Sequence, residues 1–202
     1  MTGNEMITSL GYRLEDSGHT NFDSTQKIAA LNDAQRQAVA MISNDALVHL
    51  QAQEDLDTAA TDSNFGGHTY FALPSPTGEA LMNRIVKAYD NTNERFIEMV
   101  SPDGFTDHTS YNYGTLGTLM RNRLYISTND TTVASCFLVY IGSATDIAAN
   151  GNEIENLSDS VQQAIIELAE SLLWKQDNRQ NRANAAAATA SILIQAINSQ
   201  GV

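Results

Sequence analysis

Apolar residues recur every three or four positions along the last quarter of the chain, the pattern of a helix with one buried face. Residues 157–198 contain no Pro and no Gly. The first apolar stripe consists of Val161, Ala164, Ile165, Leu168, Ala169, Leu172 and Leu173. A wholly polar stretch, 176–182, separates it from a second apolar part at 185–197. We predict one helix over 158–198, roughly 60 Å long at ~1.5 Å per residue. A break at 176–182 is the alternative.

So long a helix exceeds what a domain of 202 residues needs across its width. Its polar middle would cross solvent, and its apolar end would need a second surface to pack against. We interpret that end as a contact with another subunit or another protein. The candidate contact residues are Ala185, Ala188, Ile192, Leu193, Ile194 and Ile197. The competing interpretation is that this end folds back on the chain's own predicted helix 24–52.

The first quarter of the chain also has helical periodicity. Residues 4–15 predict a short helix, and a second helix begins near Ser24 and continues to about residue 52. Asp23 or Ser24 is a suitable N-cap, because its side-chain oxygen can accept a hydrogen bond from a free amide of the first turn. The acidic run 54–62 is predicted to be a solvated face and loop.

From residue 64 onward Gly and Pro become frequent, and β-branched and aromatic residues increase, which favours strands. We predict strands at 68–73, 83–89, 95–101, 121–127 and 132–141. The last of these is almost continuously apolar and is expected to be the central strand. A polar loop, 142–156, then leads to Ser158, the predicted N-cap of the final helix.

The predicted fold is therefore α+β, a helical layer with a small antiparallel sheet inserted in it. Residues 1–63 would form an N-terminal helical part and 64–145 the inserted β region. Residues 146–202 would form the long C-terminal helix, packed with the N-terminal helices.

The chain is acidic, with a net charge of −13. The excess is uneven, since residues 1–110 hold 16 acidic and 6 basic side chains. Neutralising phosphates requires clustered Lys and Arg, so specific nucleic-acid binding is not expected. No window approaches a membrane span. The single cysteine, Cys136, lies in an apolar run and is interpreted as a small buried hydrophobe.

Residues with catalytic or metal-binding chemistry do not form a recognisable pattern. The four histidines have no metal-ligand spacing, and an Asp45/His49 pair is better explained as a surface ion pair. The chain has no nucleophile elbow, phosphate-binding loop or dinucleotide-binding motif. We therefore predict no catalytic residue, no metal and no cofactor, and we expect the protein not to be an enzyme.

Several short motifs occur in an order that can be compared with a known family. The first are Leu10-Gly11-Tyr12-Arg13-Leu14, Phe22-Asp23-Ser24 and Leu31-Asn32-Asp33-Ala34-Gln35-Arg36. An Arg-rich strand, Arg121-Asn122-Arg123-Leu124-Tyr125, and an apolar strand ending at Tyr140 follow. The final helix then begins at Val161-Gln162-Gln163-Ala164. In this order the chain resembles the head-to-tail adaptor proteins of tailed bacteriophages, in particular those of short-tailed phages.

This resemblance implies a non-enzymatic structural protein of the virion, assembled in the host cytoplasm. Adaptors of this kind form a ring, typically of twelve copies, between the portal protein and the tail or nozzle protein. DNA passes through the central channel without being bound specifically, and no membrane is involved. The resemblance also implies that the strands at 121–125 and near Tyr140 pair with each other.

Two other functions fit parts of the sequence. A stopper or tail-tube protein would need a mobile plug segment, for which the Gly-rich stretch 142–151 is the candidate. A small acidic carbohydrate-binding module or hydrolase would need a pocket in the β region, formed by residues such as Tyr111, Tyr113 and Asp107.

Overall fold

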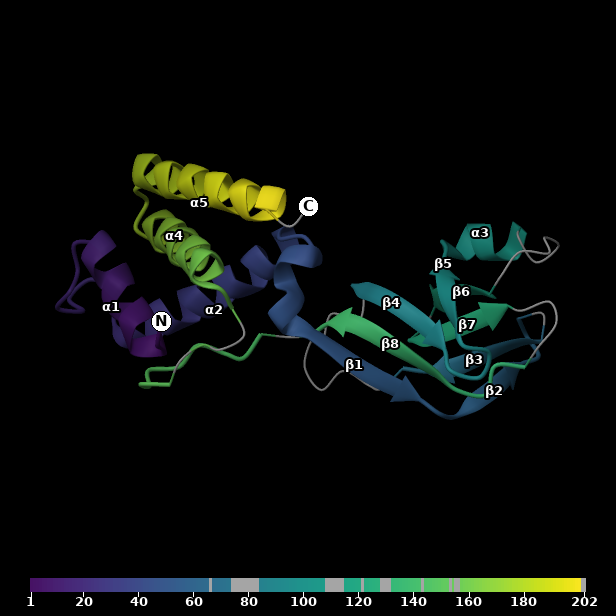
Figure 1. Ribbon diagram of the computed structural model, residues 1–202. Helices are drawn as coiled ribbons and strands as arrows, with labels where there is room; N and C mark the ends of the chain where they lie inside the picture. Colours follow the sequence, from purple (N-terminus) through teal and green to yellow (C-terminus); the bar gives the residue numbers. More distant parts are fainter. Residues whose placement is uncertain are drawn as a thin grey trace. The chain divides into compact units, whose positions relative to one another are not determined.

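The computed structural model describes residues 1–65, 67–73, 84–107, 115–120, 122–127, 132–142, 144–152, 154 and 157–200. The chain divides into two compact units, each described by itself (Figure 1). The helical unit combines both ends of the chain, Met1–Leu50 and Ala144–Val202. The sheet unit is the continuous segment Gln51–Ser143.

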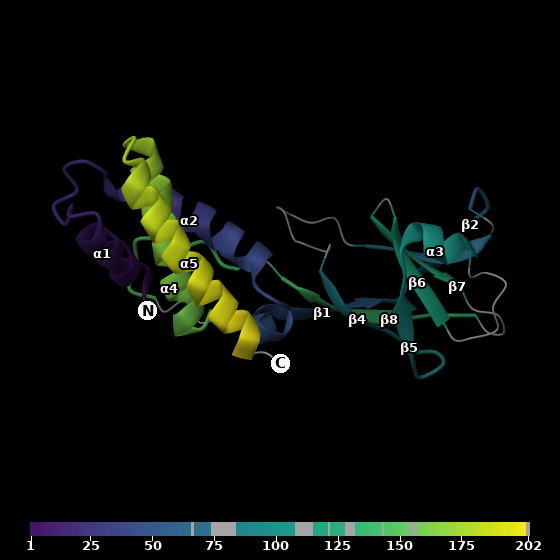
Figure 2. The ribbon, with the colours of Figure 1, turned by 90° about the horizontal axis from the view of Figure 1, so that it is seen from above.

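The helices of the helical unit are α1 (Gly3–Arg13), α2 (Ser24–Met41), the 3₁₀ helix η1 (Asp45–Leu50), α4 (Asp159–Gln176) and α5 (Gln180–Gln200). Helix α4 is central and packs against α1, α2 and α5 (Figure 2). It is accordingly buried on most sides, as expected for a helix with apolar residues all round.

Local signals define most helix starts. The Asp23 side chain accepts a hydrogen bond from the amide of Gln26, whose side chain accepts one from the Asp23 amide, so the predicted N-cap of α2 is confirmed as a capping box. Thr2 and Glu5 make the same arrangement at α1. Ser158 precedes α4 as predicted but makes no side-chain capping bond.

The prediction of one helix over 158–198 is wrong. Helix α4 ends at Gln176, and Asn178 has a left-handed backbone with φ of 57°. Asn tolerates this conformation, and the amides of Asp177 and Arg179 still donate to the carbonyls of Leu173 and Trp174. The chain therefore reverses, and α5 packs back along α4.

The strands of the sheet unit are β1 (Gln51–Leu56), β2 (Ala59–Asp62), β3 (His68–Ala72), β4 (Ile85–Asp90), β5 (Arg95–Met99), β6 (Thr115–Met120), β7 (Arg123–Ser127) and β8 (Cys136–Ile141). Among the described residues they form one eight-stranded sheet in the order β1-β8-β4-β5-β6-β7-β3-β2. The sheet is mixed, because β5 and β6 run parallel. A short helix, α3 (Pro102–Asp107), lies between those two strands in the chain.

The sheet is curled into a half-barrel, and its first and last strands explain why. Strands β1 and β2 stand at opposite ends of the strand order, yet only two residues separate Leu56 from Ala59. Such a link reaches roughly 10 Å, so the two edges are held close together where β1 ends and β2 begins. The enclosed face carries the core, which consists of Leu56, Phe71, Leu73, Ala88, Ile97, Leu124, Ile126, Val133, Cys136 and Leu138.

The chain is thus α+β, but a small antiparallel sheet inserted in a helical layer is the wrong architecture. The described sheet has eight strands and is accompanied by six helices. The acidic run expected to be a loop forms β2 and the second half of β1, and the expected helical continuation to residue 52 ends in η1. Strand β8 is second in the order, not central. Strand β7 pairs with β3 and β6, so its implied pairing with the strand ending at Tyr140 is also wrong.

Candidate functional site

Helix α5 has two apolar faces, and only one of them is used inside the helical unit. The buried face consists of Ala183, Ala186, Ala190, Ile194 and Ile197. These positions recur every three or four residues. Alanine adds only a Cβ, so the backbones of α4 and α5 can approach closely. The three alanines of this face thus stabilise the chain's own helix pair.

The opposite face of α5 is exposed and contains several of the predicted contact residues. Ala185, Ala188 and Ile192 lie on it, and Ile192 is 66% exposed. Ala196, which sequence reasoning did not select, extends the same face by one turn. Leu193 is half-buried between the two faces. We call Ala185, Ala188, Ile192 and Ala196 the outer face of α5.

Two of the predicted contact residues lie elsewhere. Ile194 and Ile197 are 5% and 7% exposed, and they belong to the buried face. The C-terminal end of α5 is fixed by Asn198, which donates to the carbonyl of Met41 and accepts from the amide of Ser43. The helix therefore returns to the end of α2, the alternative that the sequence left open. Its outer face is held on a rigid support.

A buried ion pair fixes the loop between α1 and α2. The Lys27 Nζ lies 3.0 Å from the Asp16 Oδ2, and both side chains are fully buried. The same Nζ donates to the Asp16 carbonyl at 2.6 Å and lies 3.1 Å from the Nδ1 of His19. Sequence reasoning missed this pair, since Lys27 falls on the apolar side of a helix and Asp16 lies 11 residues away.

The Asp16 carboxylate has more partners than Lys27 alone. It accepts from the amides of Thr20, Asn21 and Phe22 and from the Thr20 hydroxyl. Burial raises the pKa of the Asp16 carboxyl, but the hydrogen bonds from Asn21, Phe22, Lys27 and Thr20 outweigh it and hold that pKa well below its usual range. The pair is a structural clamp that orders residues 16–22.

The segment proposed as a mobile plug is bound to the helical unit. Asn32 donates to the carbonyl of Ile147 and accepts from its amide, at 3.0 and 2.7 Å. Gln35 donates to the carbonyl of Thr145, and the Asn4 amide donates to the carbonyl of Asn150. Ile147 itself is 2% exposed. These contacts give no support to a plug.

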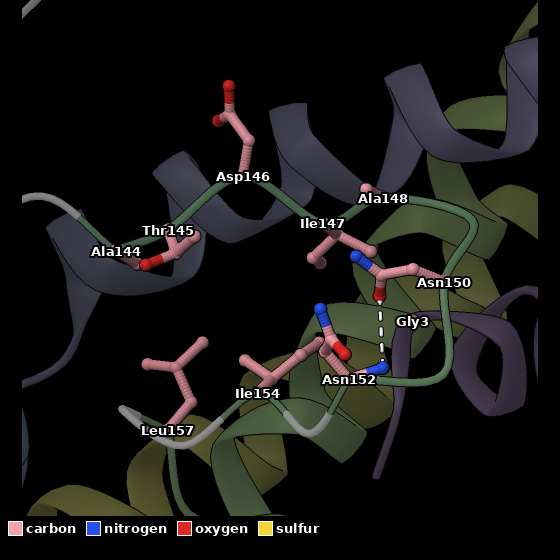
Figure 3. Close-up of a pocket in the computed structure, with 10 residues that line it drawn as sticks. All are labelled: Gly3, Ala144, Thr145, Asp146, Ile147, Ala148, Asn150, Asn152, Ile154 and Leu157. Carbon is pink, nitrogen blue, oxygen red and sulfur yellow. Dashed lines mark hydrogen bonds between the residues drawn. The ribbon is translucent and has the colours of Figure 1, made fainter.

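The same segment lines a cavity of about 250 Å³ beside the start of α1 (Figure 3). Ile147, Ile154 and Leu157 face it, whereas the carboxylate of Asp146 points away (Figure 3). Among the described lining residues Asp146 is the only charged one, so no described charged group is placed to orient a ligand inside. A second hollow, about 470 Å³, lies between α2 and α4, with Asp33 and Lys175 among its lining residues.

The described residues that were considered for chemistry form no metal site. Asp45 and His49 both lie in η1. In the described ranges no three His, Cys, Asp or Glu side chains gather closely enough to hold a metal ion. Tyr111, Tyr113 and the side chain of Asp107 lie outside the described residues. In the part of the chain that is described, no helix is both long and apolar enough to span a bilayer.

An aromatic cluster in the sheet unit was not foreseen. Phe65 stacks on Phe105 of α3 with ring centroids 6.0 Å apart, and Tyr125 meets Phe65 edge-on at 5.0 Å. The Tyr125 hydroxyl donates to Asp62 at 2.8 Å, and Arg123 bonds the same carboxylate. These contacts join β2, β7 and α3, so the cluster is part of the packing of the sheet.

No protein-family model matches the chain, and no curated protein matches it significantly.

Proposed function

We propose that this chain is a non-enzymatic structural protein of a tailed-phage virion, the subunit of a head-to-tail adaptor ring. About twelve copies would form the ring, with the portal protein on one side and the tail or nozzle protein on the other. The observation that carries the proposal is the outer face of α5, an apolar helical surface on a rigid support that the chain's own fold leaves exposed.

The outer face suits a contact between subunits. Ala185 and Ala188 are small, so another backbone can approach closely, and Ile192 supplies a branched side chain to fill a matching hollow. An exposed isoleucine within a continuous apolar stripe favours burial against a partner. A head-to-tail contact of this kind closes into a ring when the rotation between copies is regular.

The acidic charge of the chain suits a channel through which DNA passes. Carboxylates lining the lumen would repel phosphates over roughly one Debye length, about 8–10 Å, so DNA would move without adhering. We expect acidic residues from 1–110 to lie on the channel wall. A ring structure with those residues on its outer wall would exclude this part of the proposal.

The first test is the mass of the assembly that contains this chain. Native mass spectrometry of particles from infected cells should find a ring of roughly 260 kDa, twelve copies of 21.9 kDa, bound to a second ring. A monomer that is absent from virions would refute the proposal.

The second test concerns the outer face. Ile192→Glu should abolish ring formation, because the buried carboxylate would lack a partner. Val48→Glu is the matched control, since Val48 is also an exposed aliphatic residue, 55% exposed, but lies in η1. If Ile192→Glu still forms rings, or if both variants lose ring formation equally, the outer face of α5 is not the contact between subunits. Circular dichroism should show both variants folded.

The described structure gives no observation in favour of the two other functions. The stretch 142–151 is hydrogen-bonded to α1 and α2 in its described part, which does not suit the plug of a stopper. The tyrosines proposed for a carbohydrate site lie outside the described residues.

A further inference from the structure

Three aromatic rings lie side by side across neighbouring strands of the sheet unit. Phe137 of β8 is the cross-strand partner of Tyr89 of β4, which in turn faces Phe96 of β5. The ring centroids are 5.2 Å apart for the first pair and 5.3 Å for the second. Phe96 is 67% exposed, and the other two rings are half-buried. We call these three rings the aromatic ledge.

The ledge lies on the face of the sheet opposite the core. Its neighbours along the strands, Ala88, Ile97 and Leu138, all belong to the enclosed core, and side chains alternate between faces. Farther along, Phe105 of α3 packs onto this same outer face at β6 and β7. At β5 the face is open, as the exposure of Phe96 demonstrates.

Acidic side chains stand at both ends of the ledge. Asp55 of β1 is the cross-strand partner of Phe137, so the row runs across four strands, roughly 14 Å at ~4.8 Å per strand. Glu98 follows Phe96 on the same face, and Glu94 precedes it in the turn. All three carboxylates are exposed, and Lys87, two residues before Tyr89, adds a base to the same face.

We propose that the aromatic ledge, with its acidic ends, docks an arginine-bearing segment of a partner protein. The face of an aromatic ring attracts a cation, and guanidinium groups stack well on it while donating to a nearby carboxylate. A row of this length spans about four residues of extended chain. Partly exposed aromatic side chains that lie next to one another commonly mark an interaction site.

The geometry and the charge favour this occupant over two others. The planes of Tyr89 and Phe96 meet at 79°, whereas those of Tyr89 and Phe137 meet at 27°, so the three rings do not form one flat platform on which a sugar ring would lie. A second copy that docked through the same ledge would place its own Asp55, Glu94 and Glu98 against these carboxylates. The guanidinium groups of a basic partner can both stack on the rings and bind the carboxylates.

This inference goes beyond the proposed function, since it concerns a surface of the sheet unit and holds whether or not the chain forms a ring. Its test uses the full chain and a fluorescent peptide of alternating Gly and Arg, with a Gly/Lys peptide of equal charge beside it. Fluorescence anisotropy measures binding at low and at physiological salt.

We expect the Gly/Arg peptide to bind several-fold tighter than the Gly/Lys peptide, because arginine stacks better. Phe96→Ser should weaken Gly/Arg binding at least tenfold. Tyr12→Ser is the matched control, since Tyr12 is 70% exposed on α1 and should not affect binding. Glu98→Gln should weaken binding a few-fold and reduce its dependence on salt.

Equal binding by Phe96→Ser and Tyr12→Ser would overturn the inference, because the peptide would then be responding only to the overall acidity of the chain. Binding of a neutral oligosaccharide that is lost in Phe96→Ser would assign the ledge to a sugar instead. Self-association of the wild type that disappears in Phe96→Ser, seen by sedimentation, would assign it to a second copy.

Discussion

Replacing Asp16 by Asn should strongly destabilise the helical unit. The substitution preserves the shape of the side chain but removes its charge. The Lys27 ammonium, whose side chain is fully buried, then has no counter-ion. One acceptor oxygen also becomes a donor, so Asn cannot accept from Lys27 and from the amides of residues 20–22 together.

The expected loss is about 3–5 kcal/mol, the usual cost of removing one member of a buried pair. That is a large part of a total stability of roughly 5–15 kcal/mol, and it corresponds to a fall in melting temperature on the order of 10 °C or more. Replacing Lys27 by Met in the same chain should recover part of it, because no unpaired charge then stays buried.

The effect should depend on pH in a defined direction. Because the pKa of the folded Asp16 carboxyl lies below its unfolded value of about 3.9, its charge stabilises the fold above that pH. This contribution is lost as the pH falls below about 4 toward the folded pKa. The difference in stability between wild type and Asp16→Asn should therefore be full near neutrality and shrink under acid.

Urea unfolding, followed by the fluorescence of Trp174, measures this loss of stability in the helical unit. Trp174 is the only tryptophan of the chain, is 3% exposed, and meets Phe22 edge-on at 6.3 Å. Asp33→Asn is the control, because Asp33 and Arg36 form an exposed pair worth at most about 1 kcal/mol. A loss for Asp16→Asn no larger than that of the control would refute the reasoning.

Three further predictions concern other parts of the chain. Gly117→Ala should cost the sheet unit about 1–3 kcal/mol in urea unfolding, since the new Cβ would lie 2.6 Å from the Cγ2 of Ile97; an unchanged midpoint would contradict it. Cys136 should resist iodoacetamide at about pH 8 until the chain is unfolded, because burial raises the pKa of its thiol to about 12 and only the thiolate reacts. Rapid alkylation of the native chain, measured by mass spectrometry, would contradict this prediction. Arg13→Met should lower the stability measured by thermal unfolding by about 1–3 kcal/mol, since the Nη1 of Arg13 lies 2.6 Å from the buried Glu167 carboxylate of α4. An unchanged melting temperature would show that this ion pair does not stabilise the fold.

The sequence alone determined the helices whose signals are local. The 3.6-residue periodicity and the Asp23 cap identify α1, α2 and the first turns of α4, because capping bonds and a one-sided apolar stripe lie within a few residues of one another. Strands β3, β4, β5, β7 and β8 were likewise located by their β-branched and aromatic content.

Only the tertiary structure decided which partners those elements have. Strand β1 is mostly polar, and it is a strand because its backbone bonds to β8, whose paired residues lie 80 to 90 positions later in the chain. The turn at Asn178 could be read in the sequence only as a polar stretch, since reversal depends on α5 finding a buried place along α4.

The candidate surfaces likewise depend partly on local sequence and partly on the tertiary structure. Sequence periodicity selected Ala185, Ala188 and Ile192 as apolar helix positions, but it could not show that Ile194, on the same helix, is buried inside the unit. The aromatic ledge is invisible in sequence, because its rings come from three separate strands. Helical faces repeat locally, whereas pairing across a sheet depends on long-range contacts that close only when the whole chain has folded.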